Sequence, residues 1–589
     1  MAKWMLRRTT ADILNLARQA GIPPVLAHIL AVRGYKTPEA INEFINDNKP
    51  LSNPLLFADM AKAVQLTAAA INAKQKIAIF GDYDADGIMS TVILYRTLVS
   101  LGADVSYYIP KREGEGYGLN TGAINTLKEQ GIELIIACDN GISAFDEIEH
   151  AASLGLTTVI LDHHAVFIDE QEGGAQHLPL ATAVVDAQRV DCQYPFKHYC
   201  AAGLCYRFSE ALYAYYQKDW QALGEYLLPF AAIATVCDLV ELLADNRYLV
   251  KKGLPLITKN ANLGLKALLA ATNLKDKAID TYHVGFILGP CINASGRLGI
   301  ADIAVELFLT EDPALAQKIA QDLVELNTKR KTLTEDGTKL ALAAITEQNL
   351  AANKIIVLYC PQILESVAGI IAGKIKEKYY KPVIIIAGDN DILHGSCRSI
   401  EAYNIFDGLK SCQEYLLAFG GHPMAAGLSI ERNQIANFAD AINSLCKLTD
   451  EDMEAIYRID CQLPPTEANL MLAKQLNLLA PYGKGNSKPL FAYKNLSLER
   501  ITLVGREEKV MRLLLKDSQG WLIELIDFAG KERMQTFITS LGEEYWPALL
   551  AGKSKKLIKL DIIYSVGVNA FNGKESAQLQ IVDFRPSLG

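Results

Sequence analysis

The chain has 589 residues, of which 50% are hydrophobic and 21% are charged, and its formal net charge is −9. This length and composition predict about three or four globular domains with ample material for cores. The negative charge argues against a protein that coats nucleic acid by bulk charge, although it is compatible with a locally basic groove.

The eleven cysteines include no CxxC pair and no spacing typical of a disulfide framework. We therefore expect neither structural zinc nor disulfides, but reduced thiols in a cytoplasmic protein. The first ten residues, MAKWMLRRTT, contain no apolar stretch of the kind that signal peptides carry, and no apolar run approaches 18 residues. The sequence thus predicts neither secretion nor a membrane span.

In chain order, residues 1–64 read as an N-terminal helical segment. From residue 65 to 255, apolar runs alternate with helical stretches, which is typical of βαβ units and a parallel sheet. Acidic or imidazole side chains follow the runs KIAIF, ELIIA, TVIL and AAIATV, each of which we interpret as a buried strand. The side chains that follow these four runs are Asp82, Asp84 and Asp86; Asp139; Asp162, His163 and His164; and Asp238.

The carboxyl ends of strands in an open α/β sheet converge on one crevice. Carboxylates and an imidazole gathered there would form a site for Mg²⁺ or Mn²⁺, and two ions sharing a ligand would suit in-line phosphoryl displacement. The sequence therefore predicts a metal-dependent phosphoesterase. The alternative is an EF-hand calcium loop beginning at Asp82, but the twelfth position, where that loop needs Glu, is Ile93.

The remaining chain divides by texture. A Gly-rich run after Lys111 and Arg112 reads as a loop at a strand end, so it would lie near the crevice. Residues 256–352 are expected to form a helical connector, and residues 353–450 a second α/β domain. Short alternating strands from 455 to 589 suggest a small β-barrel.

Several motifs together resemble a known family. The order DYDADG (82–87), CDNG (138–141), DHH (162–164) and CDLVEL (237–242) is similar to the DHH phosphoesterase superfamily. The later runs GPCINASGR (289–297), GSCRSI (395–400) and FGGHPMAAG (419–427) narrow the resemblance to the RecJ family of single-strand-specific 5′→3′ DNA exonucleases. The resemblance covers nearly the whole chain, from about residue 65 to 585, with PYGKGN (481–486) and NAFNG (569–573) continuing it.

This resemblance implies a DHH-type parallel-sheet domain, a DHHA1-like second domain and a barrel similar to an OB-fold. It also implies roles for residues. The metal ligands would be Asp84, Asp86, Asp139, His163 and Asp238, with Asp139 bridging two ions. Asp82 would be a ligand or a supporting residue, Asp162 would orient the imidazole, and His164 would face the phosphate.

The family likeness further suggests residues that bind the strand. The chemistry is suitable because arginine meets phosphate oxygens in a bidentate way and always stays charged. The predicted substrate-binding residues are Lys111, Arg112, Tyr117, Asn293, Arg297, Ser396, Arg398, Ser399 and His422. In the barrel, the candidates for base stacking and backbone contact are Phe491, Tyr493, Phe571, Arg506, Lys509 and Arg512.

Three positions depart from the family pattern. Leu364 lies where the family usually has a Trp-His pair, Phe80 where many DHH relatives have histidine, and Val510 where a barrel histidine is often found. Because all the expected metal ligands are present, the prediction of catalysis stands.

The predicted function is degradation of single-stranded DNA 5′→3′ to 5′-mononucleotides in DNA repair and recombination. One alternative is a DHH hydrolase of small nucleotides or short oligonucleotides, against which the barrel argues. Another is a non-catalytic DNA-binding protein on a DHH fold. The resemblance implies single-strand-binding protein as a partner, and we expect a monomer.

Overall fold

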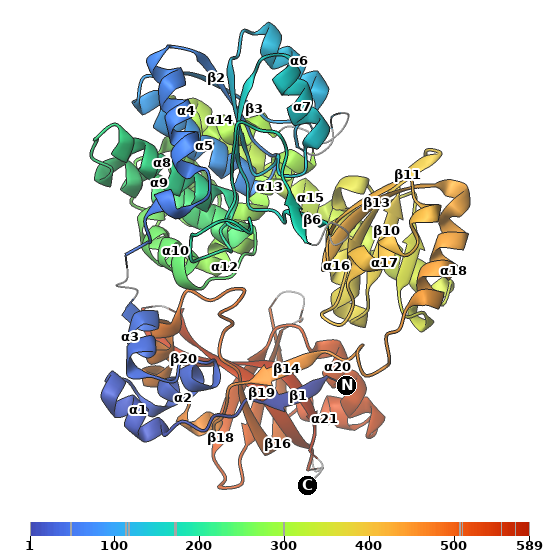
Figure 1. Cartoon of the computed structure of the whole chain (residues 1–589). Coiled ribbons are helices and arrows are strands. Elements are labelled where there is room, and N and C mark those ends of the chain that lie inside the picture. The colour runs from blue at the N-terminus through green and yellow to red at the C-terminus, as the bar shows by residue number, and fades with distance from the viewer. Residues whose placement is uncertain are drawn as a thin grey trace. The chain divides into compact units, whose positions relative to one another are not determined.

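The computed structural model describes residues 2–46, 50–111, 115, 118–169, 174–298, 301–505, 508, 510–554, 557–571 and 573–587. They belong to two units, one made of residues 51–455 and the other of residues 1–50 together with 456–589 (Figure 1). Each unit is described by itself.

A five-stranded parallel sheet organises the first part of the 51–455 unit. Its order is β3 (Asp104–Tyr108), β2 (Lys76–Phe80), β4 (Leu134–Cys138), β5 (Thr157–Leu161) and β8 (Ala183–Val185). Apolar side chains of α6 (Thr121–Glu129) and α7 (Phe145–Ser153) pack on one face, and those of α4 (Met60–Asn72), α5 (Ala85–Ser100) and α8 (Ala201–Tyr215) on the other. The expected parallel-sheet domain is thereby confirmed. A short hairpin, β6 (Phe167–Asp169) with β7 (Ala175–His177), lies outside this sheet.

One predicted strand is a helix. The run AAIATV, residues 231–236, lies inside α9 (Gln221–Cys237), so Asp238 follows a helix rather than a strand. All six residues of this run are buried, which explains the error. A helix that is apolar on every side has no periodicity that distinguishes it from a buried strand.

The expected helical connector is present. It follows α10 (Ala244–Ile257) and comprises α11 (Leu263–Ala271), α12 (Thr281–His283), the π-helix η2 (Val284–Leu288), α13 (Gly289–Arg297), α14 (Asp302–Leu309) and α15 (Pro313–Glu347). The last is a 35-residue helix that begins with Pro313 in its first turn and Asp312 as its cap, a favourable start. Its N-terminal part packs in the first domain's core and its C-terminal part in that of the second domain.

The second α/β domain has a mixed sheet of five strands. Its order is β12 (Ala418–His422), β13 (Ala425–Glu431), β11 (Ile392–Arg398), β10 (Val383–Ala387) and β9 (Ile356–Tyr359), in which only β9 and β10 pair in parallel. The helix α16 (Glu365–Tyr379) packs on one face with α15, while α17 (Ile405–Lys410) and α18 (Ile435–Leu445) cover the other. The DHHA1-like prediction is confirmed in architecture.

The C-terminal part is the predicted barrel. Its strands are β16 (Phe491–Val504), β17 (Val510–Lys516), β18 (Leu522–Asp527), β20 (Lys574–Pro586) and β19 (Lys559–Phe571), and pairing of β16 with β19 closes it. The helices α20 (Lys531–Ser540) and α21 (Tyr545–Leu550) connect β18 to β19. The short strand β15 (Cys461–Gln462) and the helix α19 (Leu470–Leu476) precede the barrel.

The N-terminal residues pack in the same unit as this barrel. The strand β1 (Lys3–Leu6) pairs in parallel with β14 (Ile456–Ile459), and the helices α1 (Ile13–Ala20), α2 (Pro24–Val32) and α3 (Pro38–Asn46) follow it. After α2, the guanidinium of Arg33 donates to both carboxylate oxygens of Asp460, at 3.0 and 2.9 Å. It also donates to Asn486 Oδ1 at 3.0 Å. This buried fork ties the N-terminal helices to the segment before the barrel.

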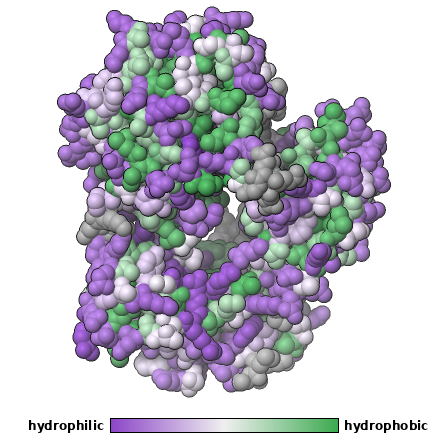
Figure 2. All heavy atoms as spheres, in the orientation of Figure 1, coloured by the Kyte–Doolittle hydropathy of each residue, from purple (hydrophilic) through white to green (hydrophobic). Residues whose placement is uncertain are grey.

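The surface is mixed. Hydrophilic side chains cover most of the face of each unit seen in Figure 2, with smaller hydrophobic areas between them. Within the described part of the chain, every helix is too short or too polar to pass through a lipid bilayer.

Candidate active site

The loop from β2 to α5 brings three carboxylates to the edge of the parallel sheet. Asp84 caps α5, because its Oδ1 accepts hydrogen bonds from the backbone N–H groups of Asp86 and Gly87 at 2.8 and 3.2 Å. Asp82 is buried against the first turn of that helix. A Cβ on Gly87 would lie 2.5 Å from the backbone N and O of Asp82, so only glycine permits this close packing.

Asp86 is a fully buried carboxylate held by the start of α8. Its two oxygens accept hydrogen bonds from the backbone N–H groups of Ala201 and Ala202 at 2.7 and 2.8 Å. Burial and the nearby charge of Asp84 nevertheless raise the pKa of Asp86 to about 7. A positive charge at this position would therefore be strongly favoured.

Asp139 follows β4 and has a positive φ of 63°. Aspartate tolerates this left-handed region better than most residues, but such a conformation still costs free energy and is concentrated at functional sites. Burial and the carboxylate of Asp86 raise its pKa well above the ordinary value. Asp139 thus adds to the same demand for positive charge.

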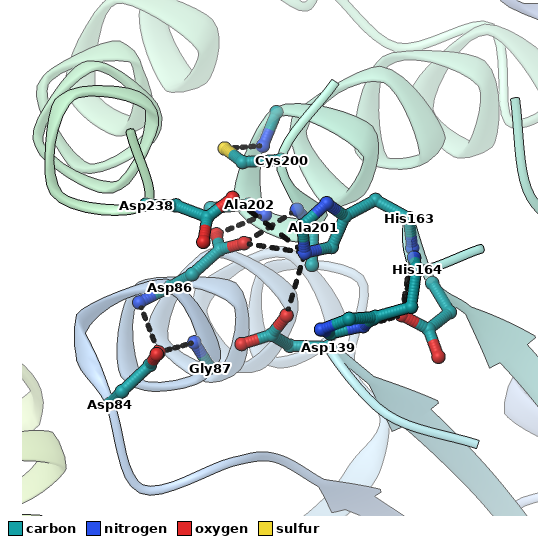
Figure 3. Close-up of polar contacts among 12 residues, drawn as sticks. Asp84, Asp86, Gly87, Asp139, His163, His164, Cys200, Ala201, Ala202 and Asp238 are labelled. Carbon is teal, nitrogen blue, oxygen red and sulfur yellow. Dashed lines mark hydrogen bonds and ion pairs between the residues drawn. The ribbon is translucent and has the colours of Figure 1, made fainter. Parts of the chain in front are cut away.

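The imidazole of His163 lies among these carboxylates (Figure 3). Its Nε2 is 3.1 Å from Asp139, 3.6 Å from Asp86 and 3.7 Å from Asp238. Burial and the neighbouring His164 lower the pKa of His163 to about 3. The ring is therefore neutral near pH 7, which is the form that binds a metal ion.

The carboxylate of Asp162 contacts both His163 and His164. Its Oδ1 accepts the backbone N–H of His163 at 2.7 Å and lies 2.7 Å from Nδ1 of His164, while Oδ2 accepts the N–H of Ile142 at 3.0 Å. Although burial opposes it, the charge of Asp162 raises the pKa of His164 to about 9. The same ion pair holds the pKa of Asp162 below its ordinary value. His164 is consequently a cation beside the carboxylate cluster.

The arrangement fits divalent metal ions. Three groups of side chains each have ligand atoms within 4.8 Å of one another: Asp82, Asp84 and Asp139; Asp86, His163 and Asp238; and Asp139, Asp162, His163 and His164. Carboxylate oxygens with one imidazole are the donor set that Mg²⁺ and Mn²⁺ accept. Asp139 and His163 each belong to two of the groups.

The predicted phosphate-binding residues approach from the connector and the second domain. The ring of His422, at the end of β12, stacks 5.9 Å from that of His164 with an interplanar angle of 8°. Arg297 Nη1 donates to the backbone oxygen of Ser366, in the first turn of α16, at 3.2 Å. Arg398 and Ser396 line the same helix, since a Cβ on Gly369 would lie 2.9 Å from Arg398 Nη2 and 3.6 Å from Ser396 Oγ.

The helix α13 contacts the metal-binding loop directly. Asn293 Oδ1 accepts the backbone N–H of Ala85 at 2.7 Å, so this side chain holds the start of α5. A Cβ on Gly296 would lie 2.2 Å from the backbone oxygen of Tyr83, which excludes any larger residue there. We predicted Asn293 as a substrate contact, but its described hydrogen bond is to the loop that carries Asp84 and Asp86.

Other predicted residues are placed differently or not at all. Ser399 is buried and donates to the backbone oxygen of Tyr403 at 2.6 Å, so it supports the fold of its domain instead of facing a strand. Lys111 is exposed in the loop after β3. Arg112, Tyr117, Arg506 and Lys509 lie outside the described residues, and the side chain of Phe571 is likewise undescribed.

In the barrel, Phe491 is fully buried against Tyr564, with ring centroids 5.7 Å apart. Its ring is therefore not accessible to bases, and the prediction that it stacks on them is wrong. As the first residue of β16, Phe491 instead fills the core of the barrel. Tyr493 is half-buried, and Arg512 lies 3.3 Å from Glu524 on the barrel surface.

The sequence reading missed three contributions. Asp186 directly follows β8 and is fully buried, and burial together with Asp162 raises its pKa to about 8. The rule that acids follow buried strands could have found it after the run AVV. The N–H groups of Ala201 and Ala202 carry no side-chain signal, because any residue at those positions would offer the same donors.

The three departures from the family pattern occupy distinct environments. Phe80 is buried at the end of β2 and stacks on Tyr108, with centroids 5.2 Å apart, so it serves the core. Leu364 precedes α16 and is 50% exposed, next to the turn that Arg297 contacts. Val510 begins β17 in the barrel.

Comparison with known proteins places this arrangement. Residues 76–235 match the DHH family, N-terminal domain; residues 352–448 match the DHHA1 domain; and residues 459–583 match the RecJ OB domain. The parallel sheet with its carboxylate cluster thus defines a DHH-type protein that carries a DHHA1 domain and an OB domain.

Full-length relatives are more specific. The single-stranded-DNA-specific exonuclease RecJ of Bacillus subtilis is 31% identical over 99% of this chain and 70% of its own. That of Haemophilus influenzae is 31% identical over 95% of this chain and 96% of its own. The crystal structure of RecJ in complex with Mn²⁺ from Thermus thermophilus superposes with a TM-score of 0.81 at 26% identity, covering 100% of this chain and 80% of that one. The chain belongs to the RecJ family.

Proposed function

We propose that this protein is a metal-dependent exonuclease that degrades single-stranded DNA 5′→3′ to 5′-mononucleotides in repair and recombination. One observation supports the proposal most: the carboxylates of Asp86, Asp139 and Asp238 converge on the neutral imidazole of His163. Relatives of the whole chain are named single-stranded-DNA-specific exonucleases.

In this proposal Asp84, Asp86, Asp139, His163 and Asp238 would hold two Mn²⁺ or Mg²⁺ ions. Asp82 would be a further ligand or a supporting residue, and Asp139 would be shared. Bound ions would supply the positive charge that stabilises the attacking and leaving oxygens of a phosphodiester. Burial and mutual repulsion raise the pKa of Asp86 and Asp139, and bound cations would offset both, which would favour metal binding at this site.

The surrounding side chains position the phosphate. Asp162 keeps His164 protonated and oriented, so its cationic ring can donate to a phosphate oxygen. His422 stacks beside it from the second domain. Burial and the charge of His164 lower the pKa of His422, so this second ring is neutral and can orient the group without adding charge. Arg297, Arg398 and Ser396 would hold the terminal phosphate of the strand by charge-assisted hydrogen bonds.

The barrel would contribute to binding of single-stranded DNA, because OB-folds combine a basic groove with stacking aromatics. A single-strand-binding protein as partner, a monomeric state and a cytoplasmic location are further parts of the proposal. All eleven cysteines are free thiols, which suits a reducing compartment.

The direct test is digestion of single- and double-stranded DNA labelled at the 5′ or the 3′ end, with Mn²⁺, with Mg²⁺ and with a chelator. We expect metal-dependent release of mononucleotides from the 5′ end of single strands only. Release from the 3′ end would contradict the polarity. Hydrolysis of dinucleotides alone would favour the small-nucleotide hydrolase, and binding without hydrolysis under any metal would favour a non-catalytic DNA-binding protein.

A further inference from the structure

One continuous helical stretch leads from the active site to an exposed pair of aromatic rings. The segments α12, η2 and α13 follow one another without a break from Thr281 to Arg297. The middle segment is a π-helix, a rare conformation that is frequent at functional sites. Asn293 and Arg297, at the far end, contact the metal-binding loop and α16.

The near end carries Tyr282 and Phe286 on the outside. Their rings stack with centroids 5.1 Å apart and an interplanar angle of 26°. They are 60% and 67% exposed, whereas Val284 and Leu288 of the same stretch are fully buried. The buried side chains anchor the helix, so the aromatic pair is presented on a rigid element and needs no burial of its own for the fold.

These two rings share a helix face with the residues at the site. Tyr282, Phe286, Asn293 and Arg297 are separated by four, seven and four positions, which is the spacing of a single stripe along a helix. A π-helix has more residues per turn than an α-helix. Over its five residues, the π segment therefore shifts the direction of this stripe around the helix axis by only part of a turn. At about 1.5 Å of rise per residue, Phe286 lies about 16 Å along the helix from Arg297. A stacked strand advances about 3.4 Å per nucleotide, so this span corresponds to about five nucleotides, and to fewer in a stretched strand.

We propose that Tyr282 and Phe286 form a base-stacking subsite for single-stranded DNA, about three to five nucleotides from the scissile end. Every base offers a π face, so stacking there would be independent of sequence, as an exonuclease that degrades strands of any sequence needs. The subsite would hold the strand in line with α13 while the terminal phosphate is held near Arg297. This inference rests on the proposed active site.

The test compares a dinucleotide with a twelve-nucleotide single strand, both carrying a 5′-phosphate, in the presence of Mn²⁺. In the full chain, Phe286→Ala and Tyr282→Ala should each raise the KM for the long strand about tenfold, since one stacked base is lost. Hydrolysis of the dinucleotide, which cannot reach the pair, should be unchanged. Phe286→Trp should keep the long-strand KM. The matched control is Tyr215→Ala, which removes another exposed tyrosine, 51% accessible, near the C-terminal end of α8.

A second measurement separates stacking from structural damage. A twelve-nucleotide strand that lacks bases at its fourth and fifth nucleotides should bind wild-type protein as weakly as the intact strand binds Phe286→Ala. The Phe286→Ala variant should bind this base-deficient strand no more weakly than the wild-type protein does. Equal losses on dinucleotide and long strand, or an unchanged KM for the long strand, would overturn the inference. Failure of the wild-type protein to hydrolyse either substrate would instead overturn the proposed function.

Discussion

Two buried carboxylates, one in each unit, differ in the groups that compensate their negative charge. Asp460, in the unit that holds the barrel, accepts hydrogen bonds from Nε and Nη2 of Arg33 at 3.0 and 2.9 Å. Asp86, in the other unit, receives two backbone N–H groups and lies 3.6 Å from a neutral imidazole. Burial is nearly complete for both.

The difference separates a structural acid from a functional one. A carboxylate whose charge is matched by a protein cation is already satisfied when the chain folds. A carboxylate surrounded by dipoles and by other carboxylates keeps an energetic demand that a mobile cation can meet. The consequence is that the two sites should respond in opposite ways to the same kind of substitution.

Arg33→Ala should give the largest effect on stability. It leaves the buried Asp460 with only the longer contact of Arg7, whose Nη1 is 4.0 Å away, and should cost about 3 kcal/mol of unfolding free energy. The measurement is urea denaturation of the full chain. The control is Arg432→Ala, which breaks an exposed pair with Asp389 at 2.7 Å and should cost less than about 1 kcal/mol. Equal denaturation midpoints for the two variants would show that the fork is not structural.

Asp139→Ala should remove activity without removing stability. We expect turnover with Mn²⁺ to fall more than about 10²-fold, or about 3 kcal/mol of transition-state stabilisation. Without metal, its melting temperature should not fall, because one of several repelling carboxylates is gone. Asp146→Ala, which alters an exposed acid in the first turn of α7, is the matched control. Near-wild-type turnover of the Asp139 variant with a normal melting curve would refute its assignment as a ligand.

Asn293→Ala sharpens the comparison, because it leaves every carboxylate in place and removes only an acceptor for Ala85 N–H. The first turn of α5 should loosen, and kcat/KM should fall about tenfold, or about 1.4 kcal/mol. In a Mn²⁺ titration, the rate at low Mn²⁺ concentration should be lower than that of the wild-type protein. The maximal rate should be reached only at a higher Mn²⁺ concentration. Asn293→Asp keeps the acceptor and should retain more activity. If both variants behave alike, the side chain acts on substrate rather than on the loop.

Leu364→His should have the smallest effect. The position is half-exposed beside the turn of α16 that Arg297 contacts, so an imidazole there could donate to a phosphate oxygen. The KM for single-stranded DNA should fall about fivefold, or about 1 kcal/mol, with little change in metal affinity. Leu445→His, at an exposed leucine of α18 in the same domain, provides the control. Unchanged kinetics would mean that position 364 does not face the strand.

The sequence allowed the sheet and the carboxylate cluster to be predicted, because strand ends and short acidic motifs are local signals. Asp82, Asp139 and His163 each follow a run that is apolar and short enough to be a buried strand, and the parallel pairing brings them together. Asp238 was placed correctly near the cluster but for the wrong reason, since a fully buried helix precedes it.

What could not be predicted depends on contacts between distant segments. The acceptor role of Asn293 toward Ala85 joins residues 208 positions apart, and the Arg33 fork joins residues 427 apart. Asn and Arg are residue types that usually lie on the surface. The residues that flank them in the sequence do not indicate the distant partner of either side chain. The same holds for the four-residue strand β1, whose run KWML has too few alternations to indicate a strand.

The pairing of β1 with β14 affects the order in which the two units can fold during synthesis. Lys3 pairs with Ile456, so β1 leaves the ribosome before its partner strand, which is made some 450 residues later. At about 5–20 residues per second, that interval is about 20–90 s. During that interval α2 has no β15 to pack against, while the intervening 51–455 unit can already fold. Of the two units, the one that holds the barrel is therefore completed second, and slow translation of residues 456–589 would prolong the exposure of β1 to chaperones and proteases.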